Sequence, residues 1–184
     1  MQSVCAPDYR RSFVLLNGEQ VLLRPVFHDD RDSLTAFFDR LGPETSFLRF
    51  HYTRAHISEQ EVRGYCECDY DSVFTLVAEM SRNGSRDIVG VGRYDRLPGS
   101  NSAEVAFVVE DGQQGKGIGT YLVKELASLA KERGLTTLVA ETVLYNEIML
   151  SIFRKYDRAL KTSVEGESCR VTFSPSGAPT QCVS

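Results

Sequence analysis

The stretch Gln114-Gly115-Lys116-Gly117-Ile118-Gly119 decides how this chain of 184 residues folds. It follows a nearly all-apolar run from Ala103 to Val109, which predicts a strand in the middle of a sheet. It leads into an amphipathic helix, predicted by apolar residues at spacings of four, four and three: Ile118, Leu122, Leu126 and Leu129. The sequence therefore predicts a buried strand, a glycine-rich turn and a helix in direct succession.

A turn of this kind is suited to bind an anion. The first turn of a helix leaves about four backbone N–H groups without partners, and the helix dipole adds partial positive charge there. Glycine lets the chain turn sharply and lets a ligand approach the backbone closely. We therefore expect Gly115, Gly117 and Gly119 to bind a pyrophosphate. Lys116 either adds charge beside the phosphates or is simply solvated.

Two common phosphate-binding patterns do not fit this turn. Ile118 stands where a P-loop requires lysine, and Thr120 stands where the dinucleotide fingerprint requires its last glycine. The pattern that fits is Gln114-x-x-Gly117-x-Gly119, which resembles the GNAT family of N-acetyltransferases over about residues 19–173. In that family this stretch joins a strand to a helix and binds the pyrophosphate of CoA.

The resemblance implies an α/β (α+β) fold with a single mixed, mostly antiparallel central sheet flanked by helices. It also implies transfer of an acetyl group from acetyl-CoA to an amine, without a metal. Asn146 resembles an asparagine near the CoA arm, and it is equally well placed to cap the helix after it. The implied acetyl-CoA contacts are Phe107, Val108, Val109, Gln114, Gly115, Lys116, Gly117, Ile118, Gly119, Thr120 and Asn146.

Further stretches resemble one branch of the family, the bacterial protein lysine acetyltransferases. They are Val21-Leu22-Leu23-Arg24-Pro25, Phe37-Phe38-x-Arg40-Leu41-x-Pro43-Glu44, Leu48-Arg49-Phe50, Asp69-Tyr70-Asp71, Ala103-Glu104-Val105-Ala106 and Glu141-x-x-x-x-Asn146-x-x-Met149-Leu150. The branch implies a protein lysine as the acceptor, with an acyl-CoA synthetase as the candidate acceptor protein. A small-molecule amine acceptor and a non-catalytic acyl-CoA-binding regulatory module remain the alternatives.

Glu104 is the candidate general base. A carboxylate can take a proton from an attacking ammonium if burial raises its pKa toward neutrality, and the branch has a glutamate at the matching position. The alternative is an exposed carboxylate at the start of a strand. Glu141 is a weaker candidate in the next strand. Many relatives carry a tyrosine that protonates the leaving thiolate, and Phe153 stands at the matching position here. Tyr156 and Tyr145 lie nearby in the sequence, but neither is assigned that role.

The rest of the chain predicts one domain over residues 19–173, an N-terminal arm over 1–18 and a flexible tail over 174–184. Strands at 73–79 and 88–94 are expected to form an antiparallel hairpin. Ser58 and Glu61 form a capping-box pattern, which predicts a helix over about 59–67.

Composition argues against several other classes of protein. The net charge of −4 disfavours nonspecific binding to nucleic acid. No apolar run is long enough to span a membrane and no secretion signal is recognised, so a cytoplasmic protein, monomer or homodimer, is expected. Three histidines (His28, His51 and His56) and five scattered cysteines (Cys5, Cys66, Cys68, Cys169 and Cys182) predict neither a metal site nor a disulfide framework.

Overall fold

The fold is built on one mixed sheet of eight strands. The computed structural model describes residues 8–15, 17–50, 56–82 and 84–177. The sheet order is β1-β2-β3-β4-β5-β6-β8-β7, and every neighbouring pair is antiparallel except β5 and β6. The strands are β1 (Arg11–Val14), β2 (Gln20–Pro25), β3 (Val73–Arg82), β4 (Ser85–Arg96), β5 (Ser102–Val109), β6 (Thr137–Val143), β7 (Lys161–Glu165) and β8 (Ser168–Phe173).

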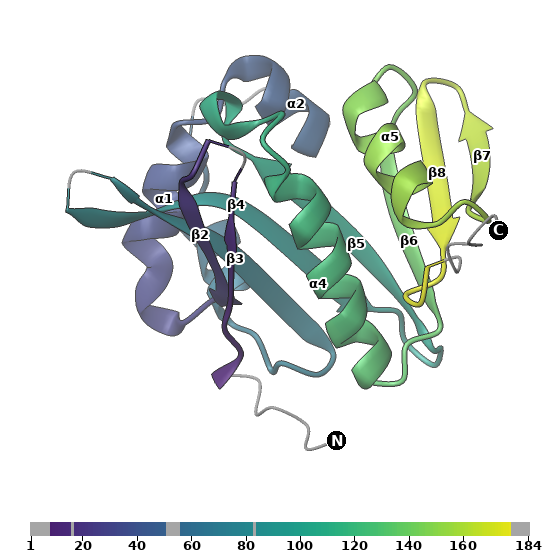
Figure 1. Cartoon of the computed structure of the whole chain (residues 1–184). Helices are drawn as coiled ribbons and strands as arrows, with labels where there is room; N and C mark the ends of the chain where they lie inside the picture. Colours follow the sequence, from purple (N-terminus) through teal and green to yellow (C-terminus); the bar gives the residue numbers. More distant parts are fainter. Residues whose placement is uncertain (1–7, 16, 51–55, 83, 178–184) are drawn as a thin grey trace, which may run out of the picture.

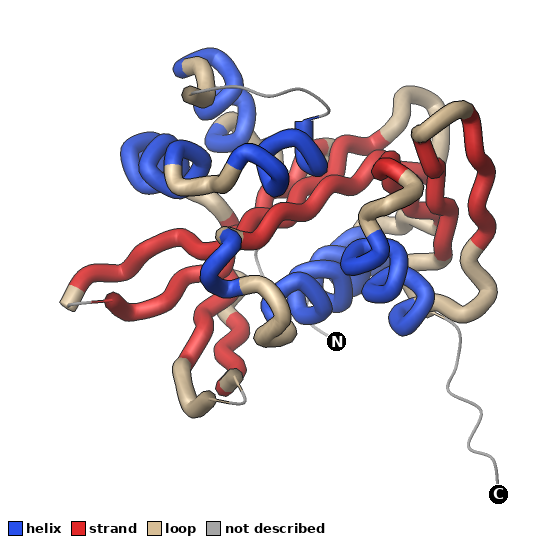
Figure 2. Tube along the Cα trace, turned by 90° about the horizontal axis from the view of Figure 1, so that it is seen from above, coloured by secondary structure: helices blue, strands red, loops and turns tan. Residues whose placement is uncertain are grey.

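Helices cover both faces of this sheet (Figures 1 and 2). One face carries α1 (Arg31–Asp39), α2 (Pro43–Phe50) and α3 (Glu59–Cys66), and the other carries α4 (Ile118–Glu132) and α5 (Glu147–Tyr156). Two short 3-10 turns, η2 (His28–Asp30) and η3 (Asp111–Gln113), precede α1 and α4. No helix in the described ranges is long and apolar enough to cross a membrane. The predicted arrangement of a mixed, mostly antiparallel sheet flanked by helices is confirmed.

Alternation along β5 divides its side chains between the two faces of the sheet. Val105 and Phe107 join the core beneath α4 and α5, whereas Val108 joins the core beneath α1 and α3. Because successive side chains of a strand point to opposite faces, Glu104 and Ala106 share the face of Val108. The strand thus places Glu104 on the side of α1, α2 and α3.

The parallel strands β5 and β6 pair over only part of their length. Ser102 to Val105 pair with Thr137 to Ala140, and beyond this point β5 pairs only with β4 and β6 only with β8. Figure 1 shows the two strands separating toward the end of the molecule where α2 and α5 lie. The sheet therefore opens at Ala106 and Glu141, with α2 in contact with both strands.

The helix ends follow their local sequence signals. Ser58 accepts a hydrogen bond from the Glu61 backbone while the Glu61 carboxylate accepts one from the Ser58 backbone, so the predicted capping box is present. Helix α4 buries Ile118, Leu122 and Leu126 against the sheet. It ends just before Gly134, whose φ of 77° is the left-handed conformation that glycine adopts without strain.

The first strand lies inside the segment predicted as an arm over residues 1–18. β1 pairs with β2 at the edge of the sheet, and Tyr9 and Leu15 beside it are buried. The ring of Phe13 stacks on Tyr121 of α4 at 3.8 Å between centroids, which explains why this short segment is held in place. In the predicted tail, the Ser174 N–H donates to Asp157 at 2.9 Å. The division into arm, domain and tail stays a prediction.

Candidate active site

The glycine loop before α4 exposes backbone N–H groups. Gly115 and Gly117 have φ of 74° and 99°, which L side chains rarely adopt, and a Cβ on either would meet no atom within 4 Å. The Tyr121 N–H donates to the Gly117 carbonyl at 3.1 Å and makes the first bond of the helix. The N–H groups of residues 118–120 therefore precede the helical ladder, and the open space above the glycines lets an anion reach them.

The side chain of Gln114 fixes this loop to the rest of the site. Its Nε2 donates to Thr45 Oγ1 of α2 and to the carbonyl of Val109 at the end of β5, both at 3.0 Å. Asp111 adds a second link, because its carboxylate accepts from the Thr45 hydroxyl at 2.7 Å and from the Gly42 N–H at 2.8 Å. The Gln114 amide thus positions the loop, which the sequence alone did not indicate.

Replacing Gln114 by glutamate is expected to weaken the binding of acetyl-CoA about tenfold. The change removes the amide donor and brings a negative charge to the edge of the anion site. Arginine at this position keeps donors and is expected to bind closer to the wild type. Calorimetric titration with acetyl-CoA measures the effect, and Gln60→Glu on the exposed side of α3 is the matched control. Equal affinity for Gln114→Glu and wild type would contradict this role.

A cavity of about 560 Å³, here named the loop cavity, runs from the glycine loop along the open side of β5. Every predicted acetyl-CoA contact except Lys116 lines it. The Lys116 ammonium instead donates to Gln113 Oε1 at 2.8 Å and lies 3.8 Å from Glu19. Sequence reasoning missed the residues that α2 and α5 add to the wall: Thr45, Leu48, Arg49, Glu147, Ile148, Met149, Ser151, Ile152 and Lys155.

The backbone of β5 faces this cavity with hydrogen-bonding groups that β4 does not use, and of these the Val109 carbonyl already accepts from Gln114. The Glu110 N–H donates to the Val89 carbonyl of β4 at 2.9 Å. Hydrogen-bonded and non-hydrogen-bonded residues alternate along an antiparallel pair, so Phe107 and Val109 direct their N–H and C=O groups away from β4. That side is the one that β6 has left. An extended amide-containing chain fits there as an added strand.

Asn146 caps α5 and is buried. Its Oδ1 accepts from the Met149 N–H at 3.2 Å, and its Nδ2 donates to Thr142 Oγ1 at 3.0 Å. The predicted N-cap is therefore confirmed. Because Asn146 also lines the loop cavity, its predicted contact with the CoA arm stays compatible with capping.

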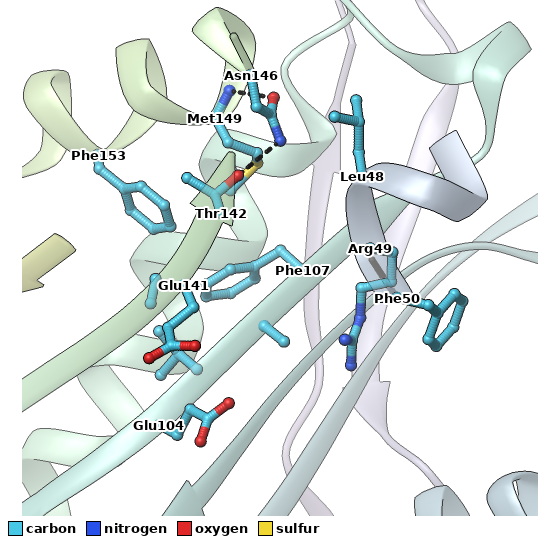
Figure 3. A pocket seen from close by; sticks show the side chains of 13 residues that line it. Leu48, Arg49, Phe50, Glu104, Phe107, Glu141, Thr142, Asn146, Met149 and Phe153 are labelled. Atoms are coloured by element: carbon cyan, nitrogen blue, oxygen red, sulfur yellow. Dashed lines mark hydrogen bonds between the residues drawn. The ribbon is translucent and has the colours of Figure 1, made fainter. Parts of the chain in front are cut away.

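Glu104 and Glu141 lie on neighbouring strands where the sheet opens (Figure 3). Both line a cavity of about 250 Å³, here named the central cavity, which shares Leu48, Arg49, Phe107, Asn146 and Met149 with the loop cavity. Glu141 accepts a hydrogen bond from Arg170 at 2.6 Å. Glu104 is exposed, and within the described ranges its side chain makes no hydrogen bond or ion pair. The exposure of Glu104 agrees with the alternative of a carboxylate at the start of a strand, and its role as general base stays a prediction.

The family model of the acetyltransferase (GNAT) family matches residues 34–157. The chain belongs to the GNAT family. Members use acetyl-CoA as cosubstrate and transfer its acetyl group to an amine. The family and the fold predicted from the sequence are confirmed, and the glycine loop with its open backbone fits a pyrophosphate.

Individual relatives agree with this assignment. An acetyltransferase from Pseudomonas aeruginosa is 27% identical over 133 residues, which make up 72% of each chain. The crystal structure of the GNAT domain of S. lividans PAT is 26% identical, with 90% of this chain and 96% of that domain covered and a TM-score of 0.80. A cAMP-binding acyltransferase from Mycobacterium smegmatis shares the fold at 24% identity and a TM-score of 0.62, over 95% of this chain but 49% of its own.

This GNAT site has no tyrosine at the position of Phe153. That ring is 1% exposed and packs between Phe107 and Phe173, at 6.1 and 5.1 Å between centroids. Tyr156 lines none of the cavities; its hydroxyl donates to the Pro175 carbonyl at 2.6 Å, and burial followed by the charge of Asp157 raises its pKa to about 12. Tyr145 is exposed and also lies outside the cavity walls.

The histidines and cysteines that the structure describes line none of the three cavities. His28 and His56 are exposed, and His51 lies outside the described residues. Cys66 and Cys169 are buried thiols and Cys68 is half-buried, whereas Cys5 and Cys182 lie outside the described residues. Burial raises the pKa of the Cys66 thiol to about 11, which makes it a poor nucleophile. Within the described ranges no group of His, Cys, Asp or Glu is arranged to hold a metal.

Proposed function

We propose that this chain transfers an acetyl group from acetyl-CoA to the side-chain amine of a protein lysine, with Glu104 as the general base. The observation that carries the proposal is the continuity of the loop cavity and the central cavity, which share five residues of their walls. One end of this path is the glycine loop that suits a pyrophosphate. The other end is Glu104 at the point where β5 and β6 separate.

Each part of the path has a chemical task. The N–H groups of the loop would bind the pyrophosphate, and the backbone of Phe107 and Val109 would align the pantetheine arm. N–H groups on this open side would also stabilise negative charge on the thioester oxygen. Glu104 would accept the proton that the ammonium loses. The amine nitrogen then bonds to the acetyl carbon, the carbon–sulfur bond breaks and CoA leaves as a thiolate. The second proton that the nitrogen loses passes through water to that thiolate.

The departing thiolate needs no dedicated acid in this proposal. Phe153 carries no proton to give, and Tyr156 is held at Pro175. A thiolate is a weaker base than an alkoxide and can leave without a protonating side chain, since even the cysteine thiol ionises in water with a pKa of about 8.5. We therefore assign the proton transfer that the protein assists to Glu104 alone.

A protein lysine is favoured as the acceptor by two kinds of similarity. The stretches around residues 21–25, 37–44 and 48–50 resemble the bacterial protein lysine acetyltransferase branch. The GNAT domain of S. lividans PAT matches nearly the whole chain with a TM-score of 0.80. A small amine is the second candidate, because a further cavity of about 310 Å³ beside Glu104 has room for one.

The test is to incubate the protein with acetyl-CoA and a panel of acyl-CoA synthetases and small amines. Release of CoA and the mass of each acceptor are followed together. Acetylation of a synthetase lysine supports the proposal, and acetylation confined to a small amine supports the second candidate. Binding of acetyl-CoA without any acetylated product would reject both and favour a regulatory acyl-CoA-binding module.

A further inference from the structure

The third cavity lies on the far side of Glu104 from the glycine loop. It measures about 310 Å³ and is here named the outer cavity. It shares Glu104 and Arg49 with the central cavity, and its remaining wall includes Tyr65 and Gly64 of α3 and Arg93 of β4. Because an acceptor amine must reach Glu104 from the side that acetyl-CoA leaves open, the outer cavity is the approach for the acceptor.

Most charges in the wall of the outer cavity are already paired. The Arg93 guanidinium binds both oxygens of Asp95 at 2.7 Å and also donates to the Gly64 carbonyl. Burial alone would lower the pKa of Arg93, but the hydrogen bond and charge of Asp95 raise it, so this pair stays charged and internally neutral. Glu61 is used in the capping box of α3. Among the residues that the structure describes in this wall, two further charges remain, the carboxylate of Glu104 and the guanidinium of Arg49.

Arg49 is held by Tyr65 and has no carboxylate partner among the described residues. Its Nη2 donates to the Tyr65 hydroxyl at 2.6 Å, and its guanidinium lies 5.0 Å from the ring centroid of Phe50. No aspartate or glutamate of the described ranges comes within the 4.0 Å of an ion pair with it. A guanidinium offers five N–H donors in a planar fork, so one bond to a phenol leaves most of them for a ligand.

Arg49 lies closer to the expected approach of the acceptor than to the expected pyrophosphate site of CoA. Thr45 lies one helical turn earlier in α2 and contacts Gln114 of the glycine loop. Arg49 is therefore one turn farther from the pyrophosphate, and its own partner Tyr65 lines only the outer cavity. Figure 3 shows Arg49 reaching from α2 across β5 on the side of Glu104.

We propose that Arg49 forms an anion subsite for the acceptor, so that the preferred acceptor carries a carboxylate close to its reacting amine. This inference rests on the proposed function and narrows its acceptor. Glu104 would bind the ammonium of the acceptor and Arg49 would bind its carboxylate. Each charge of the acceptor would then meet one side chain of opposite charge. In a protein acceptor the carboxylate belongs to an acidic residue flanking the lysine, and in a free amino acid it belongs to the same molecule.

The experiment compares matched acceptors on wild type, Arg49→Gln and Arg49→Lys. Short peptides carry one lysine and one glutamate, moved through the flanking positions, against the same peptides with glutamine. Free lysine against cadaverine tests the second source of carboxylate. Arg158→Gln is the control, because this exposed arginine lines none of the three cavities. Thermal melting and acetyl-CoA affinity establish that each variant is folded.

The wild type is expected to prefer the best glutamate peptide about tenfold to hundredfold in kcat/KM, mainly through KM. Arg49→Gln should erase this preference and Arg49→Lys should retain part of it. Arg49 also lines the loop cavity, but its guanidinium is bound to Tyr65, so both variants should keep most of their acetyl-CoA affinity. A preference that survives in Arg49→Gln would overturn the inference. So would a large loss of acetyl-CoA affinity, which would make Arg49 a cofactor contact.

Binding of the same peptides to the complex with CoA, measured by calorimetry, keeps the inference separate from the proposed function. Carboxylate-dependent binding that needs Arg49, without turnover, would support the anion subsite and reject the lysine acetyltransferase function. Turnover that ignores the carboxylate would leave the function standing and reject the subsite. A preference confined to free lysine over cadaverine would support the subsite and assign it to amino acids.

Discussion

Replacing Glu104 by glutamine is expected to lower kcat about 10²- to 10⁴-fold, the usual contribution of a general base. The amide has nearly the same shape as the carboxylate but cannot take the proton of the ammonium. Glu104 lines the central and outer cavities and not the loop cavity, so the affinity for acetyl-CoA should stay unchanged. Steady-state kinetics on an accepted amine and calorimetry with acetyl-CoA measure the two quantities.

Two control variants, each replacing another glutamate by glutamine, test whether the effect is specific to Glu104. Glu141→Gln alters the neighbouring carboxylate, which already accepts a hydrogen bond from Arg170, and a much smaller effect is expected. Glu165→Gln changes an exposed carboxylate of β7 that lines none of the cavities, and activity should remain at the wild-type level. A loss in Glu141→Gln as large as in Glu104→Gln would mean that the pair shares the task. Full activity of Glu104→Gln would reject the assignment.

Local signals explain why much of the fold could be predicted. The periodicity of α4, the capping box at Ser58 and the glycine at 134 each specify a helix or its boundary within a few residues of sequence. The apolar run before Gln114 likewise predicts β5. Because the order of these elements matches one known family, the sequence also identified the sheet. The strand β1 was missed, since four residues with one aromatic contact to α4 give no periodic pattern.

Apart from Asn146, the residues of the loop cavity that could be named from the sequence are consecutive or nearly so. The glycine loop and the end of β5 form one segment, so the residues of the loop cavity that they provide could be named. The contributions of Thr45 and Arg49 depend on how α2 packs over the opening between β5 and β6, a contact between distant segments. The sequence marks Leu48-Arg49-Phe50 only as part of a resemblance. Likewise, nothing in the sequence shows that Glu141 is paired while Glu104 is not.

Gly117→Ala is expected to raise the Kd for acetyl-CoA about tenfold to hundredfold. Gly117 holds φ at 99° and ψ at −6° at the N-cap of α4, and an alanine there would carry strain of about 1–3 kcal/mol. Relief of that strain would turn the neighbouring N–H groups away from the pyrophosphate. An unrelieved methyl group would occupy the open space where the anion is expected, because no protein atom lies within 4 Å of that Cβ. Both outcomes weaken binding, and calorimetry measures the loss.

Two control glycines outside the cavities distinguish a direct effect on the anion site from a general effect of backbone strain or an added methyl group. Gly99→Ala introduces comparable strain at φ 67° in the turn after β4, so it should lose stability without losing affinity. Gly112→Ala adds a methyl group five residues before Gly117, where the backbone is unstrained and no atom lies within 4 Å, so both properties should be retained. Wild-type affinity in Gly117→Ala would show that the loop does not bind the pyrophosphate. A loss of affinity in Gly99→Ala matching that in Gly117→Ala would attribute the effect to general destabilisation, and the backbone of the loop would lose its assigned role.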